Sequence, residues 1–200
     1  MSQFIETIQL KDGQFYNLPL HQARVNRSWR THFEGTSTID LQAVLSLAKK
    51  YPQGVFKCRV TYGQHLKTIE VLPYSIRPIR SLQLVESQLD YTFKYEDRAT
   101  LQTLFAQRGA CDDVLIVKND QITDASYSNV AFFDGQNWWT PNTPLLKGIQ
   151  REALLRRGII QEKSIPVHSI YEYSTIKLFN AMMGWETGPM LPISAIMKNW

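Results

Sequence analysis

Several features that mark special classes of protein are scarce or missing in this sequence of 200 residues. Its two cysteines, Cys58 and Cys111, lie far apart and match no metal-ligand spacing, so we interpret both as reduced structural thiols. No apolar run approaches the roughly 18–20 residues that cross a bilayer, so no membrane partner is expected. The N-terminus lacks a basic start followed by an apolar segment, which argues against a secretory signal and for a cytoplasmic protein.

Charge patterning argues against a nucleic-acid partner. The formal net charge is +4, but the basic residues are scattered, and the densest cluster, at 24–30, belongs to no recognisable nucleic-acid-binding module. The four histidines are dispersed and form no ligand pair, so we predict no metal site. Glycine-rich nucleotide-binding motifs and the Gly-x-Ser-x-Gly motif are also missing. A weakly basic enzyme that holds an anionic ligand is compatible with this balance.

Hydrophobic periodicity predicts an α+β chain of two halves, 1–87 and 88–200. In the first half we expect strands at 3–10 and 81–87, helices at 18–33 and 41–51, and a hairpin of 55–63 with 67–75. In the second half we expect helices at 95–108, 146–157 and 168–179, and three short strands within 112–141.

Three residues of the second half are candidates for chemistry. Lys94 lies between two aromatic residues, where desolvation would lower the pKa of its amine and make it nucleophilic; a solvated surface lysine is the alternative. Asp124 follows a predicted strand, where a carboxylate can hold a protonated pyridine nitrogen or simply close a turn. Gly148 precedes a predicted helix whose first N–H groups can bind phosphate, unless it is a plain helix cap.

The order and spacing of these residues resemble the class IV aminotransferases, the fold-type IV pyridoxal-phosphate enzymes. The similar segments cover nearly the whole chain: IETIQLKDGQFYNLPLHQARVNRS, KYEDRATLQTL, QITDASYSNVAFF, WWTPNTPLLKGIQR and LFNAMMGW. Among family members, aminodeoxychorismate lyase is the closest in motif. The resemblance implies a small α/β sandwich domain at 1–87, a larger pseudo-barrel domain that binds the cofactor at 88–200, and a shortened N-terminal hairpin.

The resemblance also implies a role for each matching residue. Lys94 would form the aldimine with pyridoxal 5'-phosphate and then move the α-proton of the substrate. Arg24 matches the arginine that pairs with the cofactor phosphate, a task suited to a guanidinium fork. Asp124 stands where the family has a glutamate that pairs with the pyridine nitrogen. The other implied cofactor contacts are Asn129, Gly148, Ile149, Gln150, Asn180, Ala181 and Met182.

The implied activity is a lyase-like β-elimination on a small amino-acid-type substrate. An aminotransferase of the D-amino acid or branched-chain type shares the early steps and stays an alternative. So does a catalytically degenerate relative that only binds the cofactor, and so does a non-enzymatic α+β module. The resemblance further implies a homodimer.

Overall fold

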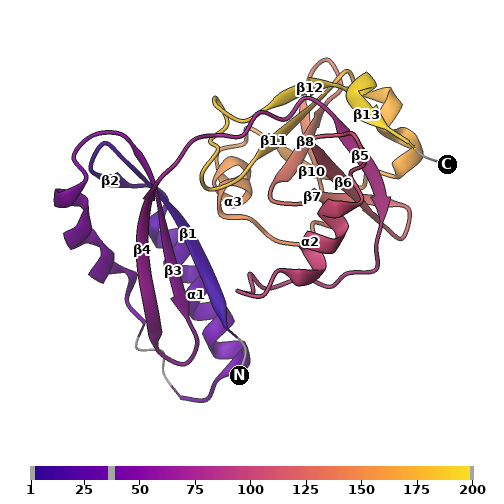
Figure 1. Ribbon diagram of the computed structural model, residues 1–200. Helices are drawn as coiled ribbons and strands as arrows, with labels where there is room; N and C mark the ends of the chain where they lie inside the picture. The colour runs from indigo at the N-terminus through magenta and orange to yellow at the C-terminus, as the bar shows by residue number, and fades with distance from the viewer. Residues whose placement is uncertain (1–2, 36–38, 199–200) are drawn as a thin grey trace. The chain divides into compact units, whose positions relative to one another are not determined.

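The computed structural model describes residues 3–35 and 39–198 and divides the chain into two compact units (Figure 1). Unit 1 extends to Ile76 and includes Phe93–Asp97; unit 2 comprises Arg77–Thr92 and the chain from Arg98 onward. The division expected after residue 87 differs from this one. The reason is strand pairing, because the segment after residue 81 pairs with strands of unit 2 and residues 93–97 pair with the first strand of unit 1.

Unit 1 is a four-stranded antiparallel sheet in the order β2-β1-β3-β4, packed against one long helix. Its elements are β1 (Phe4–Lys11), β2 (Gln14–Phe15), α1 (Leu18–His32), the 3-10 helix η1 (Leu41–Lys50), β3 (Val55–Tyr62) and β4 (Leu66–Pro73). The predicted strand at 3–10, helix at 18–33 and hairpin after residue 55 are confirmed. The segment after Asp40 forms a 3-10 helix where we expected an α-helix, and the Asp40 carboxylate accepts a hydrogen bond from the Gln42 N–H at 2.8 Å.

Unit 2 contains two sheets, ordered β13-β5-β6-β7 and β10-β9-β8-β11-β12. The first sheet is formed by β5 (Leu82–Glu86), β6 (Asp113–Lys118), β7 (Gln121–Ala125) and β13 (Ile196–Met197). The second is formed by β8 (Asn129–Phe133), β9 (Trp138–Pro141), β10 (Gln161–Lys163), β11 (Thr175–Phe179) and β12 (Met190–Pro192). The helices are α2 (Ala99–Ala106), α3 (Ile149–Arg156), η2 (Val167–Glu172) and η3 (Ile193–Ala195).

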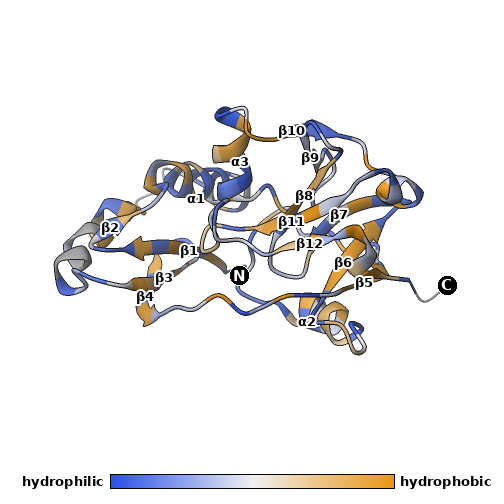
Figure 2. Cartoon of the chain, turned by 90° about the horizontal axis from the view of Figure 1, so that it is seen from above, coloured by the Kyte–Doolittle hydropathy of each residue, from blue (hydrophilic) through white to orange (hydrophobic). Residues whose placement is uncertain are grey.

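The core of unit 2 joins its two sheets. Leu115 and Ile122 of the first sheet belong to the same buried cluster as Phe132 and Ile176 of the second. Strands β5, β6 and β8 are largely hydrophobic along their length (Figure 2), as expected for strands buried on both faces. Unit 1 has its own core between α1 and the sheet, built around Phe4, Val25 and Trp29.

Three expected elements of unit 2 differ in the structure. The segment 168–179, predicted as a helix, forms most of the short 3-10 helix η2 and then strand β11, which lies between β8 and β12. The segment 112–141 holds four strands where we expected three. Helix α2 begins at Ala99 and not at residue 95, because the preceding residues extend along β1. For the first and third of these segments, pairing with a strand distant in the sequence decides the outcome. Among the described residues, no helix is long and apolar enough to cross a membrane.

Candidate active site

The Lys94 segment is attached to the edge of the unit 1 sheet. The Ile5 N–H donates to the Lys94 carbonyl at 3.0 Å, and Tyr95 bridges to Phe4. The Phe93 and Tyr95 rings lie 6.2 and 5.3 Å from the Phe4 ring, so the two aromatic neighbours of Lys94 anchor its backbone in the core. The Lys94 residue itself is half-buried.

Arg24 lies in the same unit and is held by a buried carboxylate. Its Nε donates to Glu6 Oε1 at 2.7 Å and its Nη2 donates to Glu6 Oε2 at 2.6 Å. The Nδ1 of His21, one turn earlier on α1, lies 2.5 Å from Glu6 Oε2. All three side chains are buried. Alternation along β1 places Phe4, Glu6 and Ile8 on one face, so Glu6 is a charged residue in an otherwise apolar row facing α1.

The charges of this cluster are coupled. Burial alone would raise the pKa of Glu6, but the Arg24 charge and the hydrogen bonds from His21 and Arg24 outweigh it and lower that pKa to about 2. Burial, together with the charges of Arg24 and Lys94, lowers the pKa of His21 despite the opposing effect of Glu6. Glu6 is therefore an anion, and His21 is a neutral imidazole that donates its Nδ1–H to Glu6.

In unit 2 the structure brings Asp124, Asn129 and the loop before α3 together. Asp124 lies within β7, not after a strand, and is buried. Its Oδ1 accepts from Asn129 Nδ2 at 2.7 Å, and its Oδ2 accepts from the Leu146 N–H at 2.9 Å. The same Asn129 Nδ2 donates to the Leu146 carbonyl at 2.8 Å. Asn129 therefore fixes the Asp124 carboxylate against the loop that leads to α3.

Burial raises the pKa of Asp124 to about 6, because the neutral donors Leu146 and Asn129 and the more distant charge of Arg151 only partly offset the desolvation of the carboxylate. Glu6 is in direct contact with the Arg24 guanidinium, whereas Asp124 has no cation in direct contact among the described residues. A new positive charge nearby would therefore stabilise the ionised Asp124 more than it would stabilise Glu6.

Gly148 stands at the N-cap of α3 because no other residue fits there. A Cβ at Gly148 would lie 2.0 Å from Asn129 Oδ1. The helix begins at Ile149, and its first turn has no side-chain cap, so N–H groups of Ile149 and Gln150 lie where the helix dipole favours an anion. The exposed Lys147 precedes this turn.

The loop at 180–182 is a tight turn closed by its own asparagine. Asn180 Oδ1 accepts from the Met182 and Met183 N–H groups at 2.8 and 2.9 Å. Asn180 Nδ2 donates to the Tyr127 carbonyl at 3.0 Å, which ties this loop to the turn between β7 and β8. Ala181 lies between these anchors. The Met182 N–H thus already has a partner within the loop.

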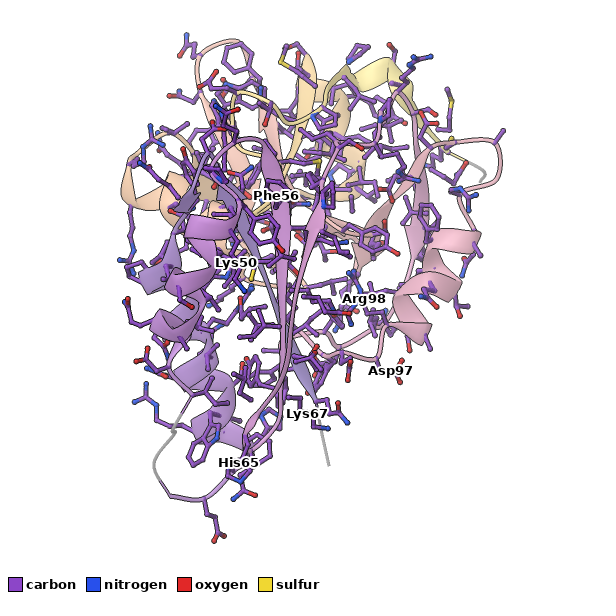
Figure 3. All side chains as sticks on the ribbon, turned by 60° about the vertical axis from the view of Figure 1, so that its left-hand side comes forward. Lys50, Phe56, His65, Lys67, Asp97 and Arg98 are labelled. Atoms are coloured by element: carbon purple, nitrogen blue, oxygen red, sulfur yellow. The ribbon has the colours of Figure 1, made fainter. Side chains whose placement is uncertain are left out.

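Arg98 supports the same β7–β8 turn from the start of α2. Its Nη2 donates to the Ser126 carbonyl at 3.1 Å, and its guanidinium carbon lies 4.2 Å from the centre of the Tyr127 ring. Figure 3 shows Arg98 beside the helix, next to Asp97. Ser126 in turn donates to Asp113 at 2.5 Å. Sequence reasoning did not single out this support.

Two residues of unit 1 were also missed as functional candidates, Glu6 and His21. A signal for Glu6 does exist in the sequence, since a single acidic residue interrupts the apolar alternation of a predicted strand. Its partner could not be identified in the same way, because Arg24 and His21 are brought opposite Glu6 only by the packing of α1 on the sheet.

Comparison with known proteins gives consistent matches. The chain matches the family described as amino-transferase class IV over residues 3–189. An uncharacterized protein from Haemophilus influenzae is 38% identical over 188 residues, covering 92% of this chain and 100% of that protein. The crystal structure of a proposed 4-amino-4-deoxychorismate lyase from Haemophilus somnus is 30% identical with a TM-score of 0.87, covering 92% of this chain and 98% of that chain. The PLP-bound structure of a hypothetical aminotransferase from Mycobacterium tuberculosis is 17% identical and shares the fold, with a TM-score of 0.78 over 99% of this chain and 84% of that one.

The sheet-and-helix unit and the two-sheet unit together define a fold-type IV pyridoxal-phosphate protein. The chain belongs to the class IV aminotransferase family, since the match extends over almost its entire length. It is thus a pyridoxal-phosphate-dependent class IV enzyme, of a family that acts on small amino-acid-like molecules.

The residues of this chain fit such a cofactor. The His21 Nε2 and the Ser128 hydroxyl are buried without a hydrogen-bond partner among the described residues. The first turn of α3 lacks a side-chain cap, and Asp124 lacks a cation in direct contact. Lys94 offers an amine, Arg24 a guanidinium and Asp124 a carboxylate, and the first turn of α3 offers N–H groups. These are the groups that an aldehyde, a phosphate and a pyridine nitrogen require.

Proposed function

We propose that this chain catalyses a lyase-like β-elimination on an amino-acid-type substrate, with Lys94 as the residue that binds the aldehyde of pyridoxal 5'-phosphate. The observation that carries the reaction type is the 30% identity to the proposed aminodeoxychorismate lyase, which extends over 98% of that chain. Segment KYEDRATLQTL, which contains Lys94, carries the motif resemblance at the point where the family has its lysine.

When bound, the cofactor withdraws electrons from the α-carbon of the substrate. Lys94 Nζ takes the α-proton as a general base. Asp124 holds a proton on the ring nitrogen, and Asn129 and the Leu146 N–H keep its carboxylate in place. Arg24 and the N–H groups of Ile149 and Gln150 bind the phosphate. Expulsion of the β-substituent with its bonding electrons would form the Cα–Cβ double bond of the product, and the expelled group would become pyruvate where that substituent is an enolpyruvyl ether. We also expect a cytoplasmic homodimer.

Lys94 is tested by spectroscopy and labelling. We expect the purified protein with added cofactor to show the absorbance band of a lysine-bound aldehyde, and Lys94→Ala to lose it. Borohydride reduction followed by mass spectrometry should place the label on Lys94. Lys67→Ala is the matched control, because Lys67 is an exposed lysine of β4 in the same unit (Figure 3). A label on another lysine, or an unchanged band in Lys94→Ala, would refute the assignment.

The family description favours an aminotransferase as the second candidate. The two reactions separate by their products. A lyase releases pyruvate and returns the aldehyde form of the cofactor, whereas a transaminase converts it to the amine form and releases a keto acid. A panel of L- and D-amino acids and of substrates with a β-leaving group decides between them. Absence of any turnover, with the band intact, would indicate a degenerate relative that only binds the cofactor.

A further inference from the structure

The Glu6–Arg24 pair occupies an unusual place for two charges. Glu6 is fully buried, and its neighbours on the same face of β1 are Phe4 and Ile8. Arg24 reaches it from α1, which otherwise packs Val25 and Trp29 against this sheet. Replacing a buried ion pair by apolar side chains of similar volume is often neutral or stabilising. Fold stability alone therefore does not account for charges at this position.

The geometry of the pair specifies an orientation. Arg24 uses its Nε and Nη2 as a fork on the two carboxylate oxygens, at 2.7 and 2.6 Å. Because the guanidinium is planar, this fork fixes both the plane and the rotation of the group. The N–H bonds that do not point at Glu6, on Nη1 and on the far side of Nη2, are then directed away from the carboxylate. One anion, Glu6, thus sets the direction in which Arg24 can meet a second anion.

A second contact holds the carboxylate itself. The Nδ1–H of His21 donates to Glu6 Oε2, so Glu6 cannot rotate without losing bonds to two residues of α1. His21 is neutral and adds no charge to compete for an incoming anion. The donors on Glu6 therefore fix its position.

We propose that Glu6 is a positioning residue that aims the Arg24 guanidinium at the cofactor phosphate. The inference rests on the proposed function, which assigns the phosphate contact to Arg24. Glu6 touches neither substrate nor cofactor; it acts through Arg24. A misaimed guanidinium keeps its charge but loses the alignment on which a fork-to-phosphate contact depends. Glu6 thus determines how strongly the protein prefers the phosphorylated cofactor.

The test compares two ligands that differ only in the phosphate, pyridoxal 5'-phosphate and pyridoxal. Glu6→Asp keeps the charge and withdraws the carboxylate by one methylene, which moves the fork. We expect this variant to weaken binding of pyridoxal 5'-phosphate roughly tenfold to a hundredfold, the range for one charged hydrogen-bonded contact. Binding of pyridoxal should change by less than about twofold, since it does not use Arg24. Absorbance titration of the lysine-bound band gives both dissociation constants.

A control variant separates the orientation of Arg24 from the stability of unit 1. Ile8→Val removes a methylene from the same face of β1 and destabilises the same core without touching a charge. It should not change the ratio of the two dissociation constants. If Glu6→Asp does not fold, Glu6→Gln takes its place: it keeps the side-chain length, and we expect it to weaken binding of pyridoxal 5'-phosphate more than binding of pyridoxal. Arg24→Lys, which keeps the cation without the fork, should reproduce the selective loss.

The results of these binding measurements distinguish a failure of the positioning role of Glu6 from a failure of the proposed function. Loss of binding in Glu6→Asp to the same degree for both ligands, as in Ile8→Val, would overturn the positioning role and leave the proposed function intact. An unchanged ratio of the two dissociation constants in both Glu6→Asp and Glu6→Gln would also overturn the positioning role. If the wild-type protein forms no lysine-bound band with either ligand, the proposed function itself fails.

Discussion

Replacing Gly148 by alanine is a sharp test of the contact between Asn129 and the start of α3. The added Cβ would lie 2.0 Å from Asn129 Oδ1 and 3.2 Å from its Cγ. Since real Cβ atoms essentially never approach a neighbour within 3.0 Å, Asn129 would have to retreat by about 1 Å. Gly148 has φ −71° and ψ 151°, a conformation that alanine adopts readily, so backbone strain does not contribute to the cost.

The retreat of Asn129 is costly because its side chain has little room to give. Its Nδ2 bonds Asp124 at 2.7 Å and the Leu146 carbonyl at 2.8 Å, in a buried setting. A displacement of about 1 Å breaks or badly distorts both hydrogen bonds. One bond to a charged group and one to a neutral group contribute about 2–4 kcal/mol together. We therefore expect Gly148→Ala to lower the free energy of unfolding by about 2–4 kcal/mol.

Urea denaturation followed by fluorescence measures this loss. Gly184→Ala is the matched control, because its Cβ would meet only Thr187 Oγ1 at 3.9 Å, so we expect a change within about 0.5 kcal/mol. The Asn129→Ala background removes the clashing amide, and there Gly148→Ala should cost less than about 1 kcal/mol. A Gly148→Ala variant as stable as the wild type, or one with the same cost in both backgrounds, would refute the reasoning.

Two further predictions concern charges of unit 2. The folded-state pKa of Asp124 is raised from 3.8 to about 6, so without cofactor its contribution to stability is greatest below pH 3.8 and falls by about 3 kcal/mol as the pH rises to about 6. Asp124→Asn should remove that fall in urea titrations across this range, and a parallel decline in the variant would contradict the raised pKa. Arg98→Met should lower the free energy of unfolding by about 1–2 kcal/mol through loss of the Ser126 bond and the Tyr127 ring contact. In a Tyr127→Leu background the loss should shrink, and an undiminished loss would show that the ring contributes nothing.

The first half of the fold could be predicted because its patterns are local. Strand β1 alternates, α1 has helical spacing and a proline at its start, and the hairpin of β3 and β4 is bounded by a glycine turn. The turn Asn119-Asp120 was also predictable, and both residues have positive φ, as a two-residue hairpin turn requires.

Elements whose conformation depends on pairing with a strand distant in the sequence could not be predicted from local patterns. The stretch before Phe179 is a strand because β8 and β12 flank it, and the Lys94 segment is extended because β1 offers it an edge. The same applies to the site. Resemblance predicted a shared role for Asp124, Asn129 and Gly148, and their mutual contacts join β7, β8 and the start of α3. No spacing in the sequence encodes the 2.0 Å approach that makes Gly148 irreplaceable.

Two of the buried carboxylates, Glu6 and Asp124, differ in their charged partners. Glu6 is paired with the Arg24 guanidinium, and its lowered pKa of about 2 keeps it an anion at neutral pH. It has nothing left to gain from a further cation, which suits a residue that holds Arg24 in place. Asp124 is bonded by neutral donors, and its raised pKa shows that its charge is incompletely compensated. A protonated pyridine nitrogen would supply the missing charge and lower that pKa, so cofactor binding and ionisation of Asp124 should favour one another. The difference in partners, rather than the difference between glutamate and aspartate, is what suits one carboxylate to positioning and the other to binding.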